Sequence, residues 1–331
     1  EAKRNAIAAG VPVALGTDGP LRDFDEAISE AERIGYPVML KAASGGGGKG
    51  IRVAHSVREL KDAYDSAAAE AVANFGDGRL YMEKYIQNPR HIEVQIIGDN
   101  FGNVVHLFER ECSVQRRHQK LIEDSPSAFV TPELRERMTR AAVDLARRVG
   151  YRNAGTIEFL VDSYRNFYFC EMNTRIQVEH PVTEQVTGVD LVCEQIRVAA
   201  GRPLSFAQED LTLRGHAIEC RINAEDPARN FAGCPGTLVS MHLPGGPGVR
   251  MDTAAYQGYQ IPPFYDSMIG KLIVYGADRQ QAIARMRRAL AETLFEGVVT
   301  GTDYQMHILR SKAFEEARFN VNSIANGDFD H

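Results

Sequence analysis

The sequence predicts an α+β protein in which a small glycine-loop unit is followed by a larger antiparallel sheet. Two patterns carry this prediction. Amphipathic helices alternate with short strands up to about residue 85, and from residue 86 onward apolar strand-like segments are joined by turn-rich stretches. With 331 residues, 44% of them hydrophobic and 25% charged, the chain can form two or three domains with a large core.

Composition and charge argue against several classes of protein. A net charge of -6 gives no support to broad binding of nucleic acid or an anionic membrane, so we expect neither partner. The five cysteines form no CxxC pair, and their odd number is typical of reduced thiols in the cytosol. No stretch approaches the roughly 18 apolar residues of a membrane-spanning helix. The opening segment reads like the end of a helix already under way, so we expect residues upstream.

The first unit begins with a predicted helix at 23–34, whose apolar residues recur on one face and which Gly35 and Pro37 end. A strand at 37–41 follows, and the apolar alternation at 51–53 predicts a second strand.

Ser56 and Glu59 predict a capping box for a helix that runs to about Asn74. Residues 13–85 therefore read as strand, helix, strand, glycine loop, strand, helix and strand.

Two hairpins dominate the second half of the prediction. The first joins strands at 91–97 and 103–109, and the second joins strands at 155–161 and 167–172. Thr131 and Pro132 open a helix that Gly150 closes. Further elements are expected as a helix near 189–200, strands near 215–222 and 268–275, and a helix near 278–295.

The segment "KAASGGGGKGIRV" at 41–53 raises the question of a phosphate site. Its GxGxxG pattern, Gly45–Gly50, precedes a strand and not the helix of a dinucleotide site, and Lys49 is followed by glycine and not by the Ser or Thr of a P-loop. A flexible hairpin of bare amides can instead close over a phosphate chain. A plain surface loop is the alternative, but Lys41 beside the loop favours a phosphate ligand.

Acidic and amide side chains gather on the second hairpin. With a period of two, Thr156, Glu158 and Leu160 share one face, and Glu171 and Asn173 share a face of the partner strand. Such oxygen ligands suit Mg²⁺, and carboxylates in so apolar a hairpin are costly unless solvated, paired or bound to a cation. A water-facing side of the sheet is the alternative.

The segment "EMNTRIQVEHPVTE" at 171–184 is dense in groups that bind or move protons. Arg175, Gln177 and Glu179 alternate, so an extended backbone would point all three the same way, around a small oxyanion that could lose a proton there. A solvated strand face is the alternative, and His180 is expected to be structural.

The basic stretch "SVQRRHQK" at 113–120 lacks interleaved aromatic residues, so an RNA-binding patch is not expected. It predicts either a solvated edge or phosphate contacts by Lys120 and His118.

Seven segments in register carry a resemblance to biotin carboxylase, the ATP-grasp component of biotin-dependent carboxylases. The resemblance covers essentially all 331 residues. The segments are "KAASGGGGKGIRV", "YMEKYIQNPRHIEVQI", "ERECSVQRRHQK", "GTIEFL", "EMNTRIQVEHPVTE", "GHAIECRINAEDP" and "PPFYDSMIGKL".

The resemblance implies an ATP-grasp fold, with a glycine-loop lid and a larger antiparallel-sheet core, followed by the biotin carboxylase C-terminal region. The implied divisions are a remnant of a preceding domain and linker at 1–12, the lid at 13–85, the core at 86–205 and the C-terminal region at 206–331. Because the family has a domain ahead of position 1, we expect the 331 residues alone to bind nucleotide poorly and to turn over slowly or not at all.

The resemblance also implies the nucleotide site. Its residues are Lys41 with Gly46, Gly47 and Gly48 on the phosphates, Glu83, Lys84 and Ile86 at the adenine, His91 toward the ribose, and Gln115, His118 and Lys120 near the phosphates and bicarbonate.

The remaining implied residues serve metal binding and catalysis. Glu158 and Glu171, with Asn173 beside them, would hold Mg²⁺ or Mn²⁺; Arg175, Gln177 and the amide of Val178 would hold bicarbonate; Glu179 would be the base; and Arg221 would stabilise negative charge, including that on the enolate-like form of biotin.

The implied activity is ATP- and bicarbonate-dependent carboxylation of biotin on a carrier protein through carboxyphosphate. Implied partners are the biotin carboxyl carrier protein or domain, a carboxyltransferase and, in the full-length protein, a second copy, with Arg250 and Phe264 in segments near the dimer interface. "EMNTR" and "EHPVTE" resemble acetyl-CoA and other acyl-CoA carboxylases more than pyruvate carboxylase, and the expected membership is in an acetyl-CoA carboxylase of fatty acid synthesis. The alternatives are another acyl-CoA or pyruvate carboxylase, a different ATP-grasp ligase, and a catalytically silent ATP-grasp module.

Overall fold

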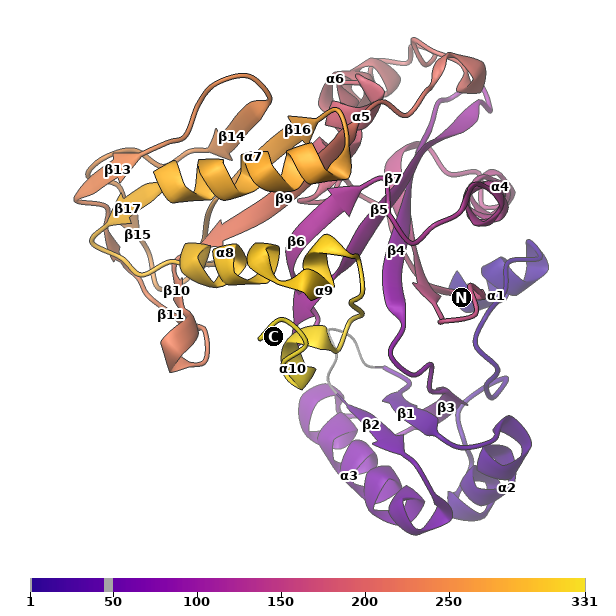
Figure 1. The fold of residues 1–331 in the computed structure, drawn as a ribbon. Helices are drawn as coiled ribbons and strands as arrows, with labels where there is room; N and C mark the ends of the chain where they lie inside the picture. Colours follow the sequence, from indigo (N-terminus) through magenta and orange to yellow (C-terminus); the bar gives the residue numbers. More distant parts are fainter. Residues whose placement is uncertain (1, 45–49, 331) are drawn as a thin grey trace. The chain divides into compact units, whose positions relative to one another are not determined.

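The computed structural model describes residues 2–44 and 50–330, in two compact units. The smaller unit is Pro12–Gln87, and the larger unit joins Glu1–Val11 to Asn88–His331 (Figure 1). Both units combine helices with antiparallel sheet, which confirms the predicted α+β class. Within the described ranges, no helix combines the length and the apolar character needed to cross a bilayer.

The smaller unit is a three-stranded antiparallel sheet with two helices. Its elements are α2 (Phe24–Ile34), β1 (Val38–Ala42), β2 (Ile51–Ala54), α3 (Val57–Phe75) and β3 (Leu80–Lys84). The strand order is β2-β1-β3, and fully buried Leu40, Leu60 and Met82 join the sheet to α3. The two strands predicted on either side of the glycines are confirmed, and they pair in the register Lys41↔Ile51.

Two details predicted for this unit are wrong. The first predicted strand, near residue 13, is absent as a ladder, and in its place Gly16 forms an isolated bridge to Glu83. The predicted capping box is incomplete, because Ser56 makes no side-chain cap hydrogen bond, although Glu59 does accept from the amide of His55 at 3.0 Å.

One glycine after the loop is explained by geometry. Gly50 has φ +70°, and a Cβ there would lie 2.9 Å from Cβ of Ala42. Both the backbone conformation and the close approach therefore require glycine at this position.

The larger unit is built on an eight-stranded sheet in which every neighbouring pair is antiparallel. Its order is β14-β16-β9-β6-β5-β4-β7-β8, so the sheet includes strands from both sides of residue 205. The strands are β4 (Arg90–Gly98), β5 (Val104–Arg116), β6 (Gln119–Ser125), β7 (Asn153–Val161), β8 (Phe167–Asn173), β9 (His216–Asn223), β14 (Val249–Thr253) and β16 (Met268–Gly276).

Helices and three short strand pairs complete the larger unit. The helices are α1 (Ala2–Ala8), α4 (Pro132–Arg148), α5 (His180–Thr187), α6 (Leu191–Ala199), α7 (Arg279–Glu292), α8 (Thr302–Arg310), α9 (Lys312–Glu315) and α10 (Ser323–Asn326). The short pairs are β10 (Glu225–Asp226) with β11 (Ala232–Gly233), β12 (Gly236–Thr237) with β15 (Gln260–Ile261), and β13 (Ser240–His242) with β17 (Leu294–Glu296).

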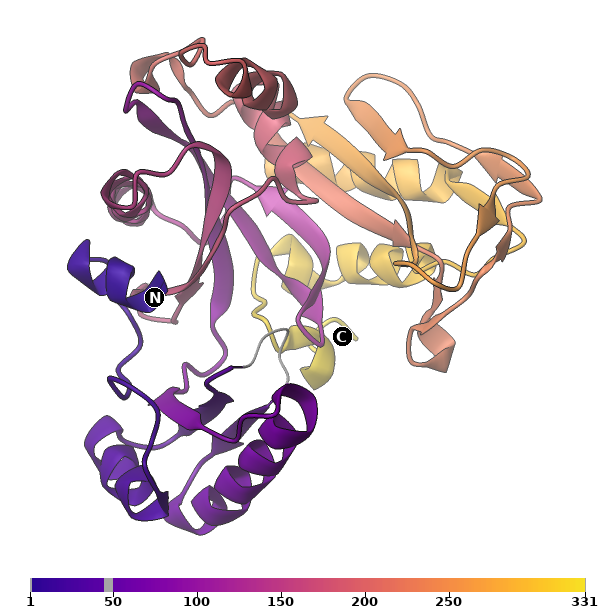
Figure 2. The same ribbon diagram turned by 180° about the vertical axis from the view of Figure 1, so that it is seen from behind.

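The two faces of β9 and β16 have different coverings. Alternate residues such as Ile218 and Leu272 join the main core with α7, which covers one face in Figure 1. Ala217 and Ile273 point the other way and pack with Val182 of α5, which lies on the opposite face in Figure 2. The same alternation places Glu219 and Arg221 of β9 on the α5 face with Ala217.

The basic stretch at 113–120 differs from its surface-edge interpretation. It forms the end of β5, a tight turn and the start of β6, a strand that the sequence pattern did not indicate. Arg117 and His118 form the turn with φ of +48° and +65°, and both side chains are exposed. Non-glycine residues rarely adopt this conformation, so their sequence carries no turn signal.

His106 of β5 predicts a pH-dependent contribution to stability. Burial lowers the pKa of its imidazole from about 6.5 to about 4. Between these values the unfolded chain binds a proton that the folded chain does not, so the free energy of unfolding should fall as pH drops through 6.5 and stop falling below 4. Urea denaturation should show up to about 2 kcal/mol of loss from this group between pH 7 and pH 5, which His106→Gln should remove. An unchanged slope in the variant would contradict this assignment.

Candidate active site

A buried lysine joins three carboxylates on the sheet of the larger unit. Nζ of Lys120 donates to Oε2 of Glu93 at 2.6 Å, to Oε1 of Glu158 at 3.1 Å and to Oε1 of Glu179 at 2.5 Å. The carboxylates come from β4, β7 and the N-cap of α5, so one ammonium ties three elements together. Burial alone would lower the pKa of Lys120, but these carboxylates outweigh it and raise the pKa above its ordinary value.

An arginine completes the contacts of Glu179. Nη2 of Arg221 lies 2.9 Å from Oε2 of Glu179, and its Nε lies 2.6 Å from Oε1 of Glu123. Glu179 therefore has one cation on each carboxylate oxygen. We call Lys120, Glu179 and Arg221 the catalytic cluster, after the roles that the sequence predicts for them.

A fully buried arginine, Arg110, contacts Glu93, the carboxylate that also accepts from Lys120. Its Nε donates to Glu93 at 2.6 Å, and its two Nη groups donate to neutral oxygens of four further side chains. These four are Gln95, Thr156, Gln177 and Thr183. Burial alone would raise the pKa of Glu93, but Lys120 and Arg110 outweigh it and hold the pKa below its ordinary value.

An irregularity in the sheet brings Lys120 and Glu123 to the same cluster. Strict alternation would turn residues three apart to opposite faces. The pairing of β5 with β6 shifts between Gln115↔Lys120 and Val114↔Ile122, which leaves Leu121 as an extra residue on β6. This β-bulge restores both charged side chains to the α5 side.

The predicted gathering of Glu158, Glu171 and Asn173 on the second hairpin is confirmed, and their role as metal ligands stays a prediction. Glu158 and Glu171 are direct cross-strand partners, and Nδ2 of Asn173 donates to both carboxylates, at 3.0 and 3.1 Å. Burial would raise the pKa of Glu158, but the contact with His91 is the first of several that hold it well below its ordinary value. The two carboxylates are hard oxygen donors of the kind that Mg²⁺ or Mn²⁺ prefers, whereas Oδ1 of Asn173 lies 3.4 Å from Nη2 of Arg175 and would have to turn to join them.

The extended, same-face arrangement predicted for Arg175, Gln177 and Glu179 is wrong. Residues 174–179 are not a strand, and Glu179 begins α5. Gln177 and Glu179 are buried in the cluster region, whereas Arg175 is exposed and contacts Asn173 at 3.4 Å. The turn that opens a helix replaces the alternation, and Pro181 at the helix start is consistent with it.

His180 matches its structural interpretation. It is buried, and its Nδ1 lies 2.8 Å from the carbonyl oxygen of Gln177. The carbonyl of Val178, next to the amide assigned to bicarbonate, accepts from Lys271 at 2.9 Å.

Of the other residues predicted to bind nucleotide in the larger unit, two lie beside the catalytic cluster and one does not. His91 places Nε2 at 3.0 Å from Glu158, which Lys120 also contacts, and buried Gln115 is the cross-strand partner of Lys120, so both flank the catalytic cluster. His118 is exposed at the hairpin turn and is not brought into it.

The smaller unit holds its own group of predicted residues. Lys41 and Glu83 are paired at 2.6 Å across β1 and β3, and Nζ of Lys84 donates to the carbonyls of Gly35 and Tyr36. Ile86 lies half-buried after β3. The prediction for Gly46, Gly47 and Gly48 lies outside the described residues.

Comparisons with known proteins match this geometry to a family. Residues 1–207 match the family model "Carbamoyl-phosphate synthase L chain, ATP binding domain", and residues 219–326 match "Biotin carboxylase C-terminal domain". The chain is 52% identical over 328 residues to "Biotin carboxylase 1" of Bacillus subtilis, covering 99% of this chain and 73% of that protein. The chain belongs to the biotin carboxylase family. The family consists of ATP-dependent carboxylating ligases, which confirms the resemblance and the ATP-grasp fold.

Other relatives include a polypeptide named for pyruvate carboxylase and a solved biotin carboxylase structure. A pyruvate carboxylase polypeptide of Methanothermobacter thermautotrophicus is 56% identical over 316 residues, which are 96% of this chain and 64% of that polypeptide. The solved "Biotin Carboxylase-beta-gamma-ATP Complex" from Campylobacter jejuni has a TM-score of 0.94 at 50% identity, over 98% of this chain and 72% of that one. The chain thus spans about two thirds to three quarters of these relatives.

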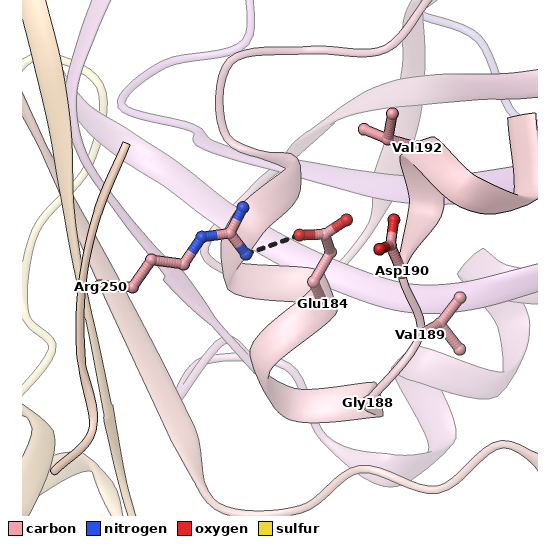
Figure 3. A pocket seen from close by; sticks show the side chains of 6 residues that line it. All are labelled: Glu184, Gly188, Val189, Asp190, Val192 and Arg250. Atoms are coloured by element: carbon pink, nitrogen blue, oxygen red, sulfur yellow. Dashed lines mark hydrogen bonds and ion pairs between the residues drawn. The ribbon is translucent and has the colours of Figure 1, made fainter. Parts of the chain in front are cut away.

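A cavity of about 450 Å³ lies apart from the catalytic cluster, between α5, α6 and β14. Figure 3 shows Arg250 reaching toward Glu184 at its wall, and their ion pair measures 2.7 Å. Phe264, the other residue assigned to the dimer interface, is 86% exposed. The interface itself stays a prediction.

Proposed function

We propose that this chain catalyses the ATP- and bicarbonate-dependent carboxylation of biotin through carboxyphosphate. The observation that carries the proposal is Glu179, held between Lys120 and Arg221 at 2.5 and 2.9 Å in a nearly dry setting. A base flanked by two cations can take a proton from an anion that the cations attract.

The reaction requires both a base and cations at this site. Bicarbonate is a poor nucleophile, so its oxygen attacks the γ-phosphorus of ATP to give carboxyphosphate and ADP while Glu179 takes its proton. Carboxyphosphate then breaks into CO₂ and phosphate, and phosphate removes the proton from the biotin ureido nitrogen, which attacks CO₂. Arg221 stabilises the negative charge on the biotin oxygen, and Lys120 the charge on the phosphoryl oxygens.

Substrate positioning is assigned to residues around this cluster. Gln177, Arg175 and the amide of Val178 would hold bicarbonate. Glu158 and Glu171, with Asn173, would hold Mg²⁺ or Mn²⁺, which supplies charge neutralisation at the phosphates when bound.

Nucleotide binding is shared with the smaller unit in this proposal. Lys41 and the glycine loop would meet the phosphates, and the segment Glu83–Ile86 would meet the adenine. His91, Gln115 and His118 would complete the nucleotide contacts. Support comes from the solved 2-oxoglutarate carboxylase domain of Hydrogenobacter thermophilus, described in complex with MgADP, ADP and bicarbonate.

The test is phosphate release from Mg-ATP and bicarbonate by the protein at its full natural length, with and without free biotin. We expect release to require bicarbonate and to rise with biotin. Release that ignores biotin but responds to an amine would favour another ATP-grasp ligase, and ATP binding without release would favour a silent module.

For the physiological acceptor we propose acetyl-CoA, in a cytoplasmic acetyl-CoA carboxylase of fatty acid synthesis that also contains a carrier protein and a carboxyltransferase. The support is the resemblance of "EMNTR" and "EHPVTE" to that group. A keto acid is the second candidate, because the relatives include polypeptides of a pyruvate carboxylase and of a 2-oxoglutarate carboxylase.

Reconstitution with the partner proteins of the same organism decides the acceptor. With labelled bicarbonate and ATP, we expect label in the carboxylation product of acetyl-CoA and none in those of pyruvate or 2-oxoglutarate. Label in a keto acid product instead would reassign the chain to that carboxylase. Size-exclusion chromatography of the same sample would test the proposed homodimer.

A further inference from the structure

Two buried glutamates lie directly opposite each other behind the catalytic cluster. Glu123 of β6 and Glu219 of β9 are cross-strand partners, and both side chains are 0% exposed. Side chains in this relation lie close enough for their carboxyl groups to meet. Among the residues that the structure describes, both oxygens of Glu219 and Oε2 of Glu123 have no hydrogen-bond partner.

The surroundings of the pair are apolar on one side and ionic on the other. The second cross-strand partner of Glu219 is Ile273, which packs with Ala217 and with Val182 of α5. The charged groups that face the pair are Arg221 of β9, Lys271 of β16, Lys120 of β6 and Glu179 at the start of α5.

The two glutamates are not equivalent. Glu123 accepts from Nε of Arg221 at 2.6 Å, whereas Glu219 has no such contact. Burial raises the pKa of both carboxyl groups, that of Glu123 to about 7 and that of Glu219 well above its ordinary value. Two adjacent carboxylates in a dry interior repel, so one proton belongs on the member without the arginine.

Glu123 also decides how Arg221 is oriented. With Nε fixed to Glu123, Nη2 is directed to Glu179, and Nη1 has no hydrogen-bond partner within the described part of the chain. A guanidinium held by one edge presents its free edge in a defined direction. Without that contact, Arg221 would retain only Glu179, the group that must react.

We propose that Glu123 is a positioning residue for Arg221, and that Glu219 is a protonated acid that donates a hydrogen bond to Oε2 of Glu123. The role of Arg221 rests on the proposed function, whereas the contact geometry and the site of the proton do not. Neither glutamate touches substrate in this proposal.

The kinetic test compares isosteric variants of the full-length protein. Glu123→Gln should lower kcat for biotin-stimulated phosphate release at least tenfold with little change in KM for ATP. Glu219→Gln, which keeps a neutral donor, should retain at least half of the wild-type kcat. The matched control is Glu109→Gln, which removes an equally buried carboxylate paired with Arg135 at 2.7 Å outside the cluster and should leave kcat unchanged. Full activity in Glu123→Gln, or equal losses in both site variants, would overturn the proposal.

A structural readout separates failure of this proposal from failure of the proposed function. The Nε–H resonance of Arg221, assigned with Arg221→Lys, should exchange slowly with water in the wild type and in Glu219→Gln, and fast in Glu123→Gln. The infrared band of a buried protonated carboxyl should be present at pH 7 in the wild type and absent in Glu219→Gln. If the wild type lacks biotin-stimulated release but shows both signals, the proposed function fails and the geometry stands. A carboxyl band that persists in Glu219→Gln would overturn the proton assignment.

Discussion

Replacing Glu179 with glutamine is expected to lower bicarbonate-dependent phosphate release by a factor of about 100 or more, because a positioned general base typically contributes about 10² to 10⁴ in rate. Glutamine keeps the shape of the side chain, but its single oxygen can replace only one of the two carboxylate oxygens that accept from Lys120 and Arg221 at 2.5 and 2.9 Å in the wild type. It cannot take the proton of bicarbonate. ATP affinity, measured by calorimetry, should stay within a few-fold of the wild type.

Glu194→Gln is the matched control for this prediction. Glu194 is also buried, at 5% exposure, but it accepts from Ser205 beside α6 and touches none of the cluster residues. Its variant should release phosphate at the wild-type rate. If Glu179→Gln retained more than a tenth of that rate, another group would have to be the base.

Replacing Arg110 with leucine should destabilise the larger unit by about 3–5 kcal/mol, the usual cost of removing one partner of a buried ion pair. The side chain is fully buried, and its loss would leave Glu93 with Lys120 as its remaining close cation. Four neutral side chains would lose a hydrogen bond in the same step. The free energy of unfolding in urea measures the effect.

The contrast for this variant is Arg140→Leu. Arg140 pairs with Glu136 one turn away on α4, and both side chains are 69% exposed. Exposed pairs of this kind contribute little, so its urea midpoint should match the wild type. A similar midpoint for Arg110→Leu would mean that the buried network contributes no net stability.

Much of the fold follows from local sequence patterns. The helix with its N-cap at Asp23 and the hairpin that pairs Glu158 with Glu171 were predictable, because period, cap and turn residues agree there. Two of the differences between prediction and structure have one cause in common. The segment at 174–179 and the start of β6 depart from regular alternation, through a helix start and a bulge that sequence alone does not announce.

Within the candidate site, only the residues assigned to contact substrates were predictable, and the residues that hold them in place were not. The resemblance assigned roles to Lys120, Glu179 and Arg221, whereas Glu93, Arg110 and Glu123 were missed. Glu93 and Arg110 also lie in segments that resemble the family, so the resemblance of a segment did not single them out. Glu93 is the acidic member of the strand "HIEVQII", and its alternation with His91 and Gln95 was the available signal. No local pattern marks Arg110, because its partners come from several elements.

The extra residue at Leu121 makes the placement of two charges depend on the bulge and not on regular alternation. If β6 were straightened at its present length, Lys120 and Glu123 would face opposite sides of the sheet, and one of them would be turned toward the apolar side occupied by Ile122 and α7. Deletion of Leu121 would instead leave the two charged residues two positions apart, where regular alternation alone keeps them on the α5 side. A one-residue deletion here would therefore cost the packing of one apolar side chain but would move no charge into the hydrocarbon core.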